Sequence, residues 1–279
     1  MTKLGLIAGG GALPLALAAH CITQGRPLFV IRLKGFADPG LSAYAGADAE
    51  LGEFGRIVRL ARDAKCAALC FAGRVPRPNF ASLKLDLKGA MLIPGLAIAA
   101  RRGDEGLLRY LTGLFESEGF ALEGAHEVMS DLTLPIGPLG RHSPSPRDSA
   151  DIAKAVAAAQ AIGALDAGQG AVVCEGLVLA LEAQEGTDAM LRRVADLPSH
   201  VRGDPTRRRG VLAKVAKPIQ DERVDLPTIG PDTIAAANRA GLAGVVGVAG
   251  KMIVLDRAAV VAAADAGGLF VVGVPDSGA

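Results

Sequence analysis

Short apolar runs alternate with glycine-containing turns and longer amphipathic segments throughout the first half of the chain. The short runs have the character of buried strands, and the longer segments repeat their apolar residues with the period of a helix. Because strands and helices alternate, the pattern predicts a parallel sheet with helices on its faces. The expected strands cover residues 4–7, 27–33, 67–72 and 120–122, and the expected helices cover residues 13–20, 54–65 and 104–119.

A stretch rich in proline, glycine and serine, residues 129–146, interrupts this pattern near the middle of the chain. Such a composition favours a linker or an extended connection over a core element. We therefore predict an N-terminal α/β domain over residues 1–130, a Pro/Gly-rich linker over 131–148 and a C-terminal α/β domain over 149–279. In the second domain, strands are expected over residues 171–174, 177–182, 210–215, 244–248, 252–254 and 269–274, helices over 149–165, 187–194, 232–241 and 257–266, and a charged loop over 201–209.

The composition excludes some classes of protein. The 30 Lys and Arg residues balance the 29 Asp and Glu residues, and with 8 Phe, 2 Tyr and no Trp the chain lacks both the basic surface and the stacking platforms of a nucleic-acid-binding protein. No uncharged apolar run reaches the roughly 18 to 20 residues of a membrane-spanning helix. We expect a cytoplasmic protein, at most resting on a membrane, whose cysteines are buried thiols: Cys21, Cys66, Cys70 and Cys174.

Three consecutive glycines, Gly9 to Gly11, follow the first predicted strand and precede the first predicted helix. Backbone amides without side chains at the positive end of a helix suit a phosphate or a diphosphate. The dinucleotide-binding pattern is incomplete, because Pro14 stands in the place of its third glycine and Arg32 stands where an acid would bind ribose. The alternative is a tight turn that needs glycine for packing alone.

Two arginines, Arg74 and Arg77, follow the third predicted strand, at the carboxyl edge where open parallel sheets bind ligands. They either contact a phosphate, for which guanidinium groups are well suited, or carry ordinary solvated charges. His126, which precedes Glu127, is interpreted as a hydrogen-bonded structural histidine in preference to a proton shuttle.

Polar residues interrupt the apolar runs of the second domain, within residues 165–194 and 214–231. Carboxylates and amides at the ends of buried strands are costly to hold without partners, so this accumulation favours a ligand site. Lysines would neutralise phosphate oxygens there, and an aspartate would hold Mg²⁺ or align a water molecule. Alternatively, Thr187 and Asp188 cap a helix and Asp225 caps a turn. The residues concerned are Asp166, Gln169, Glu175, Glu185, Asp188, Lys214, Lys217, Gln220, Asp225 and Thr228.

Several segments carry a family resemblance: LGLIAGGGALP, GAHEV, LDAGQGAVV, EAQEGTDAML, and KPIQDERVDLPTIGP followed by AGLAGVVG. Over nearly its whole length, the chain resembles the UDP-2,3-diacylglucosamine pyrophosphatases of the lipid A pathway, in the form found in alphaproteobacteria and other Gram-negative lineages that lack the metallophosphoesterase type. The resemblance implies a Rossmann-like N-terminal domain and a C-terminal α/β domain. It also implies hydrolysis of UDP-2,3-diacylglucosamine to 2,3-diacylglucosamine 1-phosphate and UMP, by attack of water on the α-phosphorus with Mg²⁺ assisting.

The resemblance also implies site residues and partners. The family's essential aspartate lies in a DLPTIG motif and corresponds to Asp225, which we expect to be catalytic and to hold Mg²⁺ together with Asp188. The lipid nucleotide is expected to lie between the domains of a homodimeric protein that contacts the cytoplasmic face of the inner membrane. The expected substrate-binding residues are Gly9, Gly10, Gly11, Ala12, Leu13, Gly73, Arg74, Gln169, Thr187, Asp188, Lys214, Lys217 and Thr228.

Two other functions remain open from the residues themselves. A nucleotide-dependent oxidoreductase would use the three glycines for NADP, with Arg32 facing the 2′-phosphate. A carrier of lipids or nucleotides without catalytic activity would use the same pocket but would have no need of Asp225.

Overall fold

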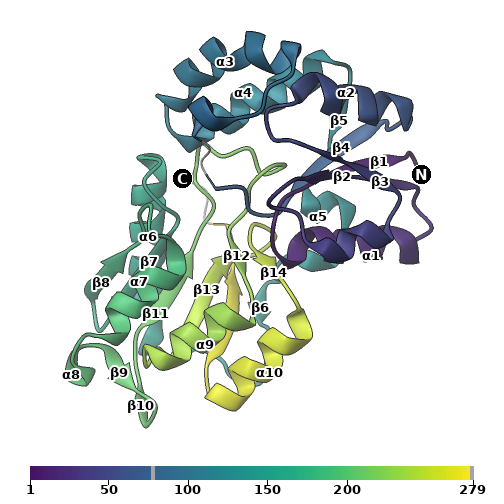
Figure 1. The fold of residues 1–279 in the computed structure, drawn as a ribbon. Helices are drawn as coiled ribbons and strands as arrows, with labels where there is room; N and C mark the ends of the chain where they lie inside the picture. Colours follow the sequence, from purple (N-terminus) through teal and green to yellow (C-terminus); the bar gives the residue numbers. More distant parts are fainter. Residues whose placement is uncertain (77–78, 277–279) are drawn as a thin grey trace. The chain divides into compact units, whose positions relative to one another are not determined.

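The computed structural model describes residues 1–76 and 79–276 of the chain. The chain forms two compact units, unit 1 with Met1–Ser130 and Arg223–Asp225, and unit 2 with Asp131–Glu222 and Leu226–Ala279. Both units combine a β-sheet with helices (Figure 1), so the prediction of two α/β domains is confirmed.

Unit 1 contains a five-stranded parallel sheet in the order β3-β2-β1-β4-β5. Its strands are β1 (Leu4–Ala8), β2 (Leu28–Leu33), β3 (Gly46–Ala49), β4 (Ala68–Ala72) and β5 (Ala121–Leu122), and its helices are α1 (Ala12–Thr23), α2 (Phe54–Asp63), α3 (Leu87–Ala100), α4 (Asp104–Ser117) and α5 (Ala125–Val128). Short 3₁₀ turns occur at η1 (Pro39–Ala43), η2 (Phe80–Ser82) and η3 (Ser130–Leu132), the last at the boundary with unit 2.

Helices cover both faces of the unit 1 sheet, with α1 and α5 on one side and α2, α3 and α4 on the other (Figure 1). The alternation of side chains along a strand explains this arrangement. Ile31 and Leu33 of β2 belong to the core that contains Phe54 and Phe115, whose rings lie 4.8 Å apart, whereas the buried Val30, which precedes Ile31, points to the opposite face. The chain runs from β1 outward to β2 and β3 and then returns to β4, so the sheet has a topological switch point between β1 and β4.

Unit 2 contains a six-stranded mixed sheet in the order β6-β15-β13-β11-β7-β8, in which β11, β13 and β15 are parallel to one another. The strands of unit 2 as a whole are β6 (Gly137–Pro138), β7 (Gly170–Cys174), β8 (Leu177–Leu181), β9 (Gly203–Asp204), β10 (Arg207–Arg208), β11 (Val211–Lys214), β12 (Thr228–Ile229), β13 (Gly244–Val248), β14 (Ile253–Val254) and β15 (Phe270–Val274). The helices of unit 2 are α6 (Asp148–Ala164), α7 (Gly186–Ala195), α8 (Ser199–Arg202), α9 (Pro231–Arg239) and α10 (Arg257–Gly267).

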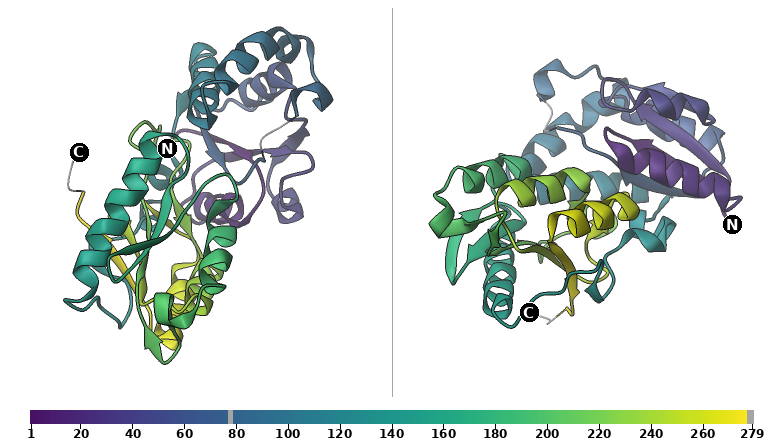
Figure 2. Two further views of the ribbon diagram at one scale, coloured as in Figure 1. Left: turned by 90° about the vertical axis from the view of Figure 1, so that its left-hand side faces the viewer. Right: turned by 90° about the horizontal axis from the view of Figure 1, so that it is seen from below.

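The Ala-rich helix α6 lies on one face of the unit 2 sheet, and α7, α9 and α10 lie on the other (Figures 1 and 2). The side chains of successive residues in the central strand β11 point to these two faces alternately. Leu212 joins the larger core beneath α7, α9 and α10, whereas Val211 and Ala213 join the core that contains Ala155 of α6. The small side chains of α6 let this helix approach the sheet closely.

The predicted linker over residues 131–148 is wrong, because this segment is an ordered part of unit 2. β6 pairs with β15 at the edge of the sheet, and Leu134 is fully buried in the core. Arg257 donates hydrogen bonds to the carbonyls of Asp131 and Thr133, at 2.6 Å each. Proline-rich backbone is compatible with an edge position, where some amides need no ladder partner.

The charged segment 201–209 is not a simple loop. The short helix α8 leads into a two-stranded antiparallel hairpin of β9 and β10, and Asp204 accepts hydrogen bonds from Thr206 within the turn. Two-residue strands depend on backbone pairing, so their side chains give no periodic signal to predict them from.

The four cysteines are free thiols and all are buried, as predicted. Burial raises the pKa of the Cys70 thiol to about 12 and that of Cys174 to about 11, so both are unreactive near neutral pH. Within the described ranges, no helix is long and apolar enough to cross a bilayer.

Candidate active site

The glycine loop and the turn after β4 meet at the switch point of the unit 1 sheet. The Gly9 amide donates to the Ala72 carbonyl at 2.8 Å, and Gly10 and Arg74 exchange two backbone hydrogen bonds at 2.9 and 2.8 Å. These bonds bring together residues that are more than sixty positions apart in sequence. The structure therefore places Gly9, Gly10, Gly11, Gly73 and Arg74 in one cluster at the carboxyl edge, as the sequence predicts.

The glycines of this cluster have two different physical roles. Gly73 has a φ of +93°, and a Cβ there would lie 2.6 Å from the Gly10 carbonyl oxygen, so glycine is required for close packing. Gly11 has a φ of +91°, but a Cβ there would meet no described atom within 4 Å. Helix α1 begins immediately after Gly11, with the amides of Ala12 and Leu13 in its first turn. The open end of this helix is the part of the loop that suits an anionic group.

The arginines near this loop differ in their availability to a ligand. Arg74 is exposed, and Arg77 lies outside the described residues. Arg32 is held by Asp48 of the neighbouring strand, with 2.6 Å between Nε and Oδ1. Because Arg32 already has a carboxylate partner, the structure does not favour its use as a 2′-phosphate ligand in an oxidoreductase.

A second cluster forms at one edge of the unit 2 sheet. Strand register pairs Lys214 with Gly170 and Ala171 with Leu181, so the carboxyl ends of β11 and β8 meet the amino end of β7. Gln169, which immediately precedes β7, accepts a hydrogen bond from the Val215 amide at 2.9 Å. The sheet thus brings Gln169 and Lys214, one from each of the two polar segments, to one edge.

Lys214 of this cluster is buried and Lys217 is partly buried, and each has a partner. The Lys214 side chain is only 5% exposed, and its Nζ donates to the Thr228 carbonyl at 3.0 Å. Lys217 Nζ lies 2.6 Å from Asp166 Oδ1, and both side chains are largely shielded from solvent. A buried ammonium group is costly unless acceptors surround it, so these contacts hold positive charge in place at this edge.

Several buried polar atoms of the same cluster have no hydrogen-bond partner within the described part of the chain: Glu182 Oε2, Gln169 Oε1 and Gln220 Nε2. Glu182 is 7% exposed, and its other oxygen accepts a hydrogen bond from Thr187 Oγ1 at 3.0 Å. A side chain on Gly170 would collide with the Glu182 carboxylate, so glycine makes room for it. Unpaired buried polar atoms are expensive, so their accumulation favours a ligand that donates to the two oxygens and accepts from Gln220 Nε2.

Glu182 is the functional candidate that sequence reasoning missed. It ends the apolar run of β8, and the only signal was a carboxylate at the end of a strand. Two acids that did attract attention instead form surface ion pairs, Glu175 with Arg209 and Glu185 with Arg193. The sequence could not show which of these acids is buried, because burial depends on the end of the paired strands at which each residue lies.

Helix α7 does not use Thr187 and Asp188 as N-caps. Its N-cap residue is Glu185, so both residues lie inside the first turn. Thr187 contacts Glu182 instead, and Asp188 is exposed. The capping alternative is therefore wrong, and the contact with Glu182 gives Thr187 a place in the cluster.

Asp225 lies in the short segment Arg223–Asp225, which belongs to unit 1, whereas Asp188 belongs to unit 2. Arg223 Nη1 donates to Glu116 Oε1 at 2.9 Å. A Cβ on Gly124 would lie 3.1 Å from the Arg223 Cα and 2.5 Å from the His126 Cε1, so this segment lies against the GAHEV turn. His126 Nδ1 is buried without a partner among the described residues, so its predicted structural hydrogen bond is not seen at this nitrogen.

The acidic residues do not form a complete protein cage for a metal. In residues 1–76 and 79–276, no three His, Cys, Asp or Glu side chains are grouped so that they could hold an ion. Mg²⁺ commonly takes only one or two protein carboxylates and completes its shell with water and substrate phosphates.

Comparison with known proteins covers both units. Residues 3–132 match the LpxI N-terminal domain, and residues 135–272 match the LpxI C-terminal domain. The chain is also similar to the UDP-2,3-diacylglucosamine pyrophosphatase LpxI of Caulobacter vibrioides, with 62% identity over 274 residues and 98% of each chain covered.

The unpaired oxygen of Glu182 leads to a stability prediction. Glu182→Gln keeps the acceptor for Thr187 and removes a buried charge, so we expect the free energy of unfolding to stay the same or rise by about 1 kcal/mol. Asp151→Asn is the matched control, because Asp151 is also buried but accepts hydrogen bonds from the amides of Glu175 and Gly176 at 2.7 Å each. That change should lower the free energy of unfolding by about 1 to 3 kcal/mol.

Urea denaturation of the two variants and the parent protein measures both changes. A loss of stability in Glu182→Gln as large as that in Asp151→Asn would show that the Glu182 carboxylate is held for structural reasons.

Proposed function

The chain belongs to the LpxI family, and we propose that it is a UDP-2,3-diacylglucosamine pyrophosphatase of lipid A biosynthesis. It hydrolyses the diphosphate of UDP-2,3-diacylglucosamine to give 2,3-diacylglucosamine 1-phosphate and UMP. The observation that carries this conclusion is the 62% identity to a pyrophosphatase with this substrate over 98% of both chains. The ranges matched by the two family domains cover the segments that contain both clusters.

The chemistry of the two clusters suits this substrate. A diphosphate ester is anionic, and the buried Lys214 offers fixed positive charge in a region of low dielectric, beside the ion pair of Lys217 with Asp166. The uracil imide and the sugar hydroxyls are hydrogen-bond donors, which the unpaired oxygens of Gln169 and Glu182 can accept. The open end of α1 after Gly11 provides amide donors for phosphate oxygen.

In the proposed reaction, the oxygen of water bonds to the α-phosphorus, and the bond from this phosphorus to the bridging oxygen breaks. The sugar phosphate leaves with the bridging oxygen, and UMP retains the oxygen from water. Asp225 accepts a hydrogen bond from the attacking water and holds it in line with the leaving group. Lysine ammonium groups offset the charge that grows on the phosphate oxygens.

We also propose that the enzyme uses Mg²⁺, held by Asp225 and the substrate's diphosphate, with Asp188 as a further candidate ligand. When bound, the ion would supply additional charge stabilisation at phosphorus. Support comes from the family's essential aspartate at the position of Asp225 and from the preference of Mg²⁺ for one or two protein carboxylates together with phosphate oxygens.

The proposed setting is the cytoplasmic face of the inner membrane. The buried, reduced cysteines suit a reducing compartment, and a substrate with two acyl chains resides in a bilayer. We further propose a homodimer. The edge strand β8 supports this, since Leu177, Val178 and Leu181 are 60%, 44% and 40% exposed on a strand that has one unpaired side in the described sheet.

Asp225→Asn should lower kcat by about a hundredfold or more, because the amide is a poorer acceptor for the attacking water and a poorer metal ligand. The KM for UDP-2,3-diacylglucosamine should change by less than about threefold, since the substitution is isosteric and leaves the binding clusters in place. Asp232→Asn, an exposed residue in the first turn of α9, is the control and should retain full activity. Steady-state release of UMP provides the measurement, and equal kcat values for Asp225→Asn and the parent would support a carrier.

Turnover in oxygen-18 water tests the position of attack. Because water bonds to the α-phosphorus, the label should appear in UMP and be absent from 2,3-diacylglucosamine 1-phosphate, as read by mass spectrometry of both products. Label in the sugar phosphate would place the attack on the other phosphorus, and tight NADPH binding with no release of UMP would favour an oxidoreductase.

A further inference from the structure

Helix α3 exposes an apolar stripe along its whole length. The exposed positions 87, 90, 91, 94 and 98 follow helical spacing and carry no charge. Leu87, Met91 and Ile98 are 81%, 65% and 59% exposed, and Leu85, just before the helix, is 39% exposed. A helix that is apolar on all sides is ordinarily buried on all sides. The stripe is therefore an apolar surface that the described fold leaves uncovered.

The opposite side of α3 is firmly held. Asp86 caps the helix by accepting a hydrogen bond from the Gly89 amide at 2.7 Å, and its second oxygen accepts from the Arg56 amide of α2 at 2.7 Å. Gly95 packs so closely on the Tyr110 ring of α4 that a Cβ would collide with it. Because α3 is anchored to both neighbours, its apolar stripe faces outward as a consequence of the fold.

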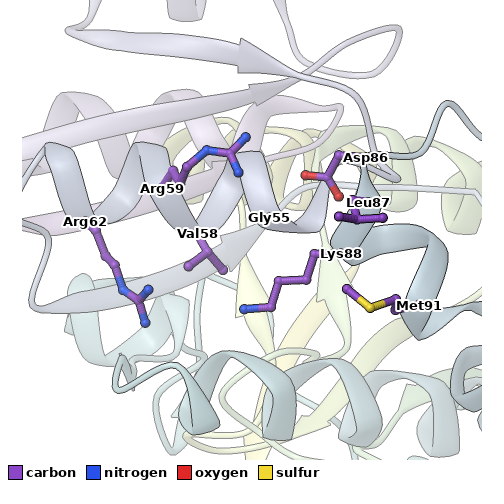
Figure 3. Close-up of a pocket in the computed structure, with 8 residues that line it drawn as sticks. All are labelled: Gly55, Val58, Arg59, Arg62, Asp86, Leu87, Lys88 and Met91. Atoms are coloured by element: carbon purple, nitrogen blue, oxygen red, sulfur yellow. The ribbon is translucent and has the colours of Figure 1, made fainter.

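Basic side chains line the space beside the stripe. A hollow of about 430 Å³ between α2 and α3 is lined by Arg59, Arg62 and Lys88 together with Leu87 and Met91 (Figure 3). Figure 3 shows Lys88 extending from α3 toward α2. Residues 84–102 contain four basic side chains and one acidic side chain in a protein whose net charge is +1.

Two carboxylates balance part of this charge. Glu118 forms ion pairs with Lys88 and Arg62, which hold the pKa of its carboxyl group below the usual range. Asp86 is occupied by backbone amides and lies near Arg59, which also lowers its pKa. Three cations and Asp86 line the hollow, and Glu118 pairs with two of the cations from beside it, so the surplus charge next to the apolar stripe is positive.

We propose that the α3 stripe and the basic hollow beside it, lined by Arg59, Arg62 and Lys88, form a docking surface for an anionic lipid bilayer. Leu87, Met91 and Ile98 enter the boundary between headgroups and acyl chains, and the cations contact lipid phosphates. Apolar residues beside lysines and arginines on one helix surface are the combination that binds anionic membranes.

A second copy of the chain fits this surface less well. A symmetric dimer places the same patch of both subunits face to face, so Arg59, Arg62 and Lys88 would lie near their own counterparts. Like charges opposed across an interface disfavour association, and the cores of interfaces are depleted of charged groups. Lipid phosphates supply the opposite charge without this penalty.

This inference rests on the proposed function in one respect, which is that a lipid substrate has to be taken from a bilayer. Docking through unit 1 would bring the enzyme to the surface in which that substrate lies. None of the residues of this surface belongs to the glycine-loop cluster or to the cluster of unit 2, so binding to vesicles can be measured without substrate and without turnover.

Flotation with vesicles tests the apolar half of the surface. The parent protein should bind vesicles that contain about 30% phosphatidylglycerol more strongly than pure phosphatidylcholine vesicles. Met91→Gln with Ile98→Gln should weaken this binding by about tenfold or more, because two side chains can no longer be buried. Ile22→Gln is the matched control, since Ile22 on α1 is 60% exposed and Ile98 is 59% exposed. The control should bind like the parent.

Charge substitutions test the basic half. Arg59→Gln should weaken binding to anionic vesicles by about fivefold and leave binding to phosphatidylcholine unchanged. Arg239→Gln on α9, also exposed, is the control for charge removal and should have no such effect. Raising NaCl from about 50 to about 500 mM should weaken the parent's binding more than that of Arg59→Gln.

Activity and mass measurements separate the alternatives. In detergent micelles the double variant should retain the parent kcat, whereas on vesicles its apparent KM should rise. Unchanged vesicle binding in the double variant would overturn the proposal.

A change in the oligomeric mass of the double variant, measured by light scattering, would assign the stripe to a second copy of the chain. A loss of activity in detergent as large as that on vesicles would assign the stripe to the acyl chains of the substrate. An absence of UMP release by the parent in detergent would count against the proposed function and leave the docking result standing.

Discussion

The burial of polar groups at one edge of the unit 2 sheet is the constraint on which the account of this enzyme depends. The register of β7 with β11 and β8 brings Lys214, Gln169 and Glu182 to that edge. Two of these side chains carry an oxygen without a partner in the described ranges, although leaving such groups unpaired costs about 1 to 3 kcal/mol each. A fold selected for stability alone would replace them with apolar residues. Their presence is explained if the substrate supplies the missing donors.

The pattern of the sequence was sufficient for the elements with long, regular apolar runs. Most strands of both central sheets and most of the long helices lie close to their predicted positions, because buried strands leave a clear signal. The short edge strands β3 and β6 and the helix α3 were not predicted. The domain that begins at residue 131 was harder to delimit. Leu134 is buried in the unit 2 core within a segment whose prolines and glycines favoured a linker. A composition rich in proline and glycine indicates a flexible segment only where no tertiary contacts hold that segment in the core.

The candidate site could be predicted as a collection of residues but not as an arrangement. Gly73 and Gly11 look alike in sequence, yet one is fixed by the Gly10 carbonyl and the other faces open space. Glu175 and Glu182 flank the same strand, yet one pairs with Arg209 on the surface and the other is buried. These distinctions follow from strand register and turn geometry. The identity of the substrate came from family membership, because phosphate-binding chemistry alone does not specify a lipid nucleotide.

The enzyme meets its substrate in two environments. The uridine diphosphate part calls for buried charge and hydrogen-bond acceptors, whereas the acyl chains hold the molecule in a bilayer. In our proposals these demands fall on different surfaces, the first on the polar edge of unit 2 with its unpaired oxygens and the second on the exposed apolar stripe of α3.

The most direct test of the central claim is the affinity of UDP-2,3-diacylglucosamine for Gln169→Leu in an Asp225→Asn background, measured by titration calorimetry in detergent. Gln184→Leu, a change of the same kind at an exposed position of unit 2, serves as the comparison. If the buried Gln169 oxygen accepts a hydrogen bond from the substrate, its loss should raise Kd by about tenfold, whereas Gln184→Leu should leave Kd unchanged. Equal affinities for the two variants would contradict the claim that this edge of the sheet binds the substrate.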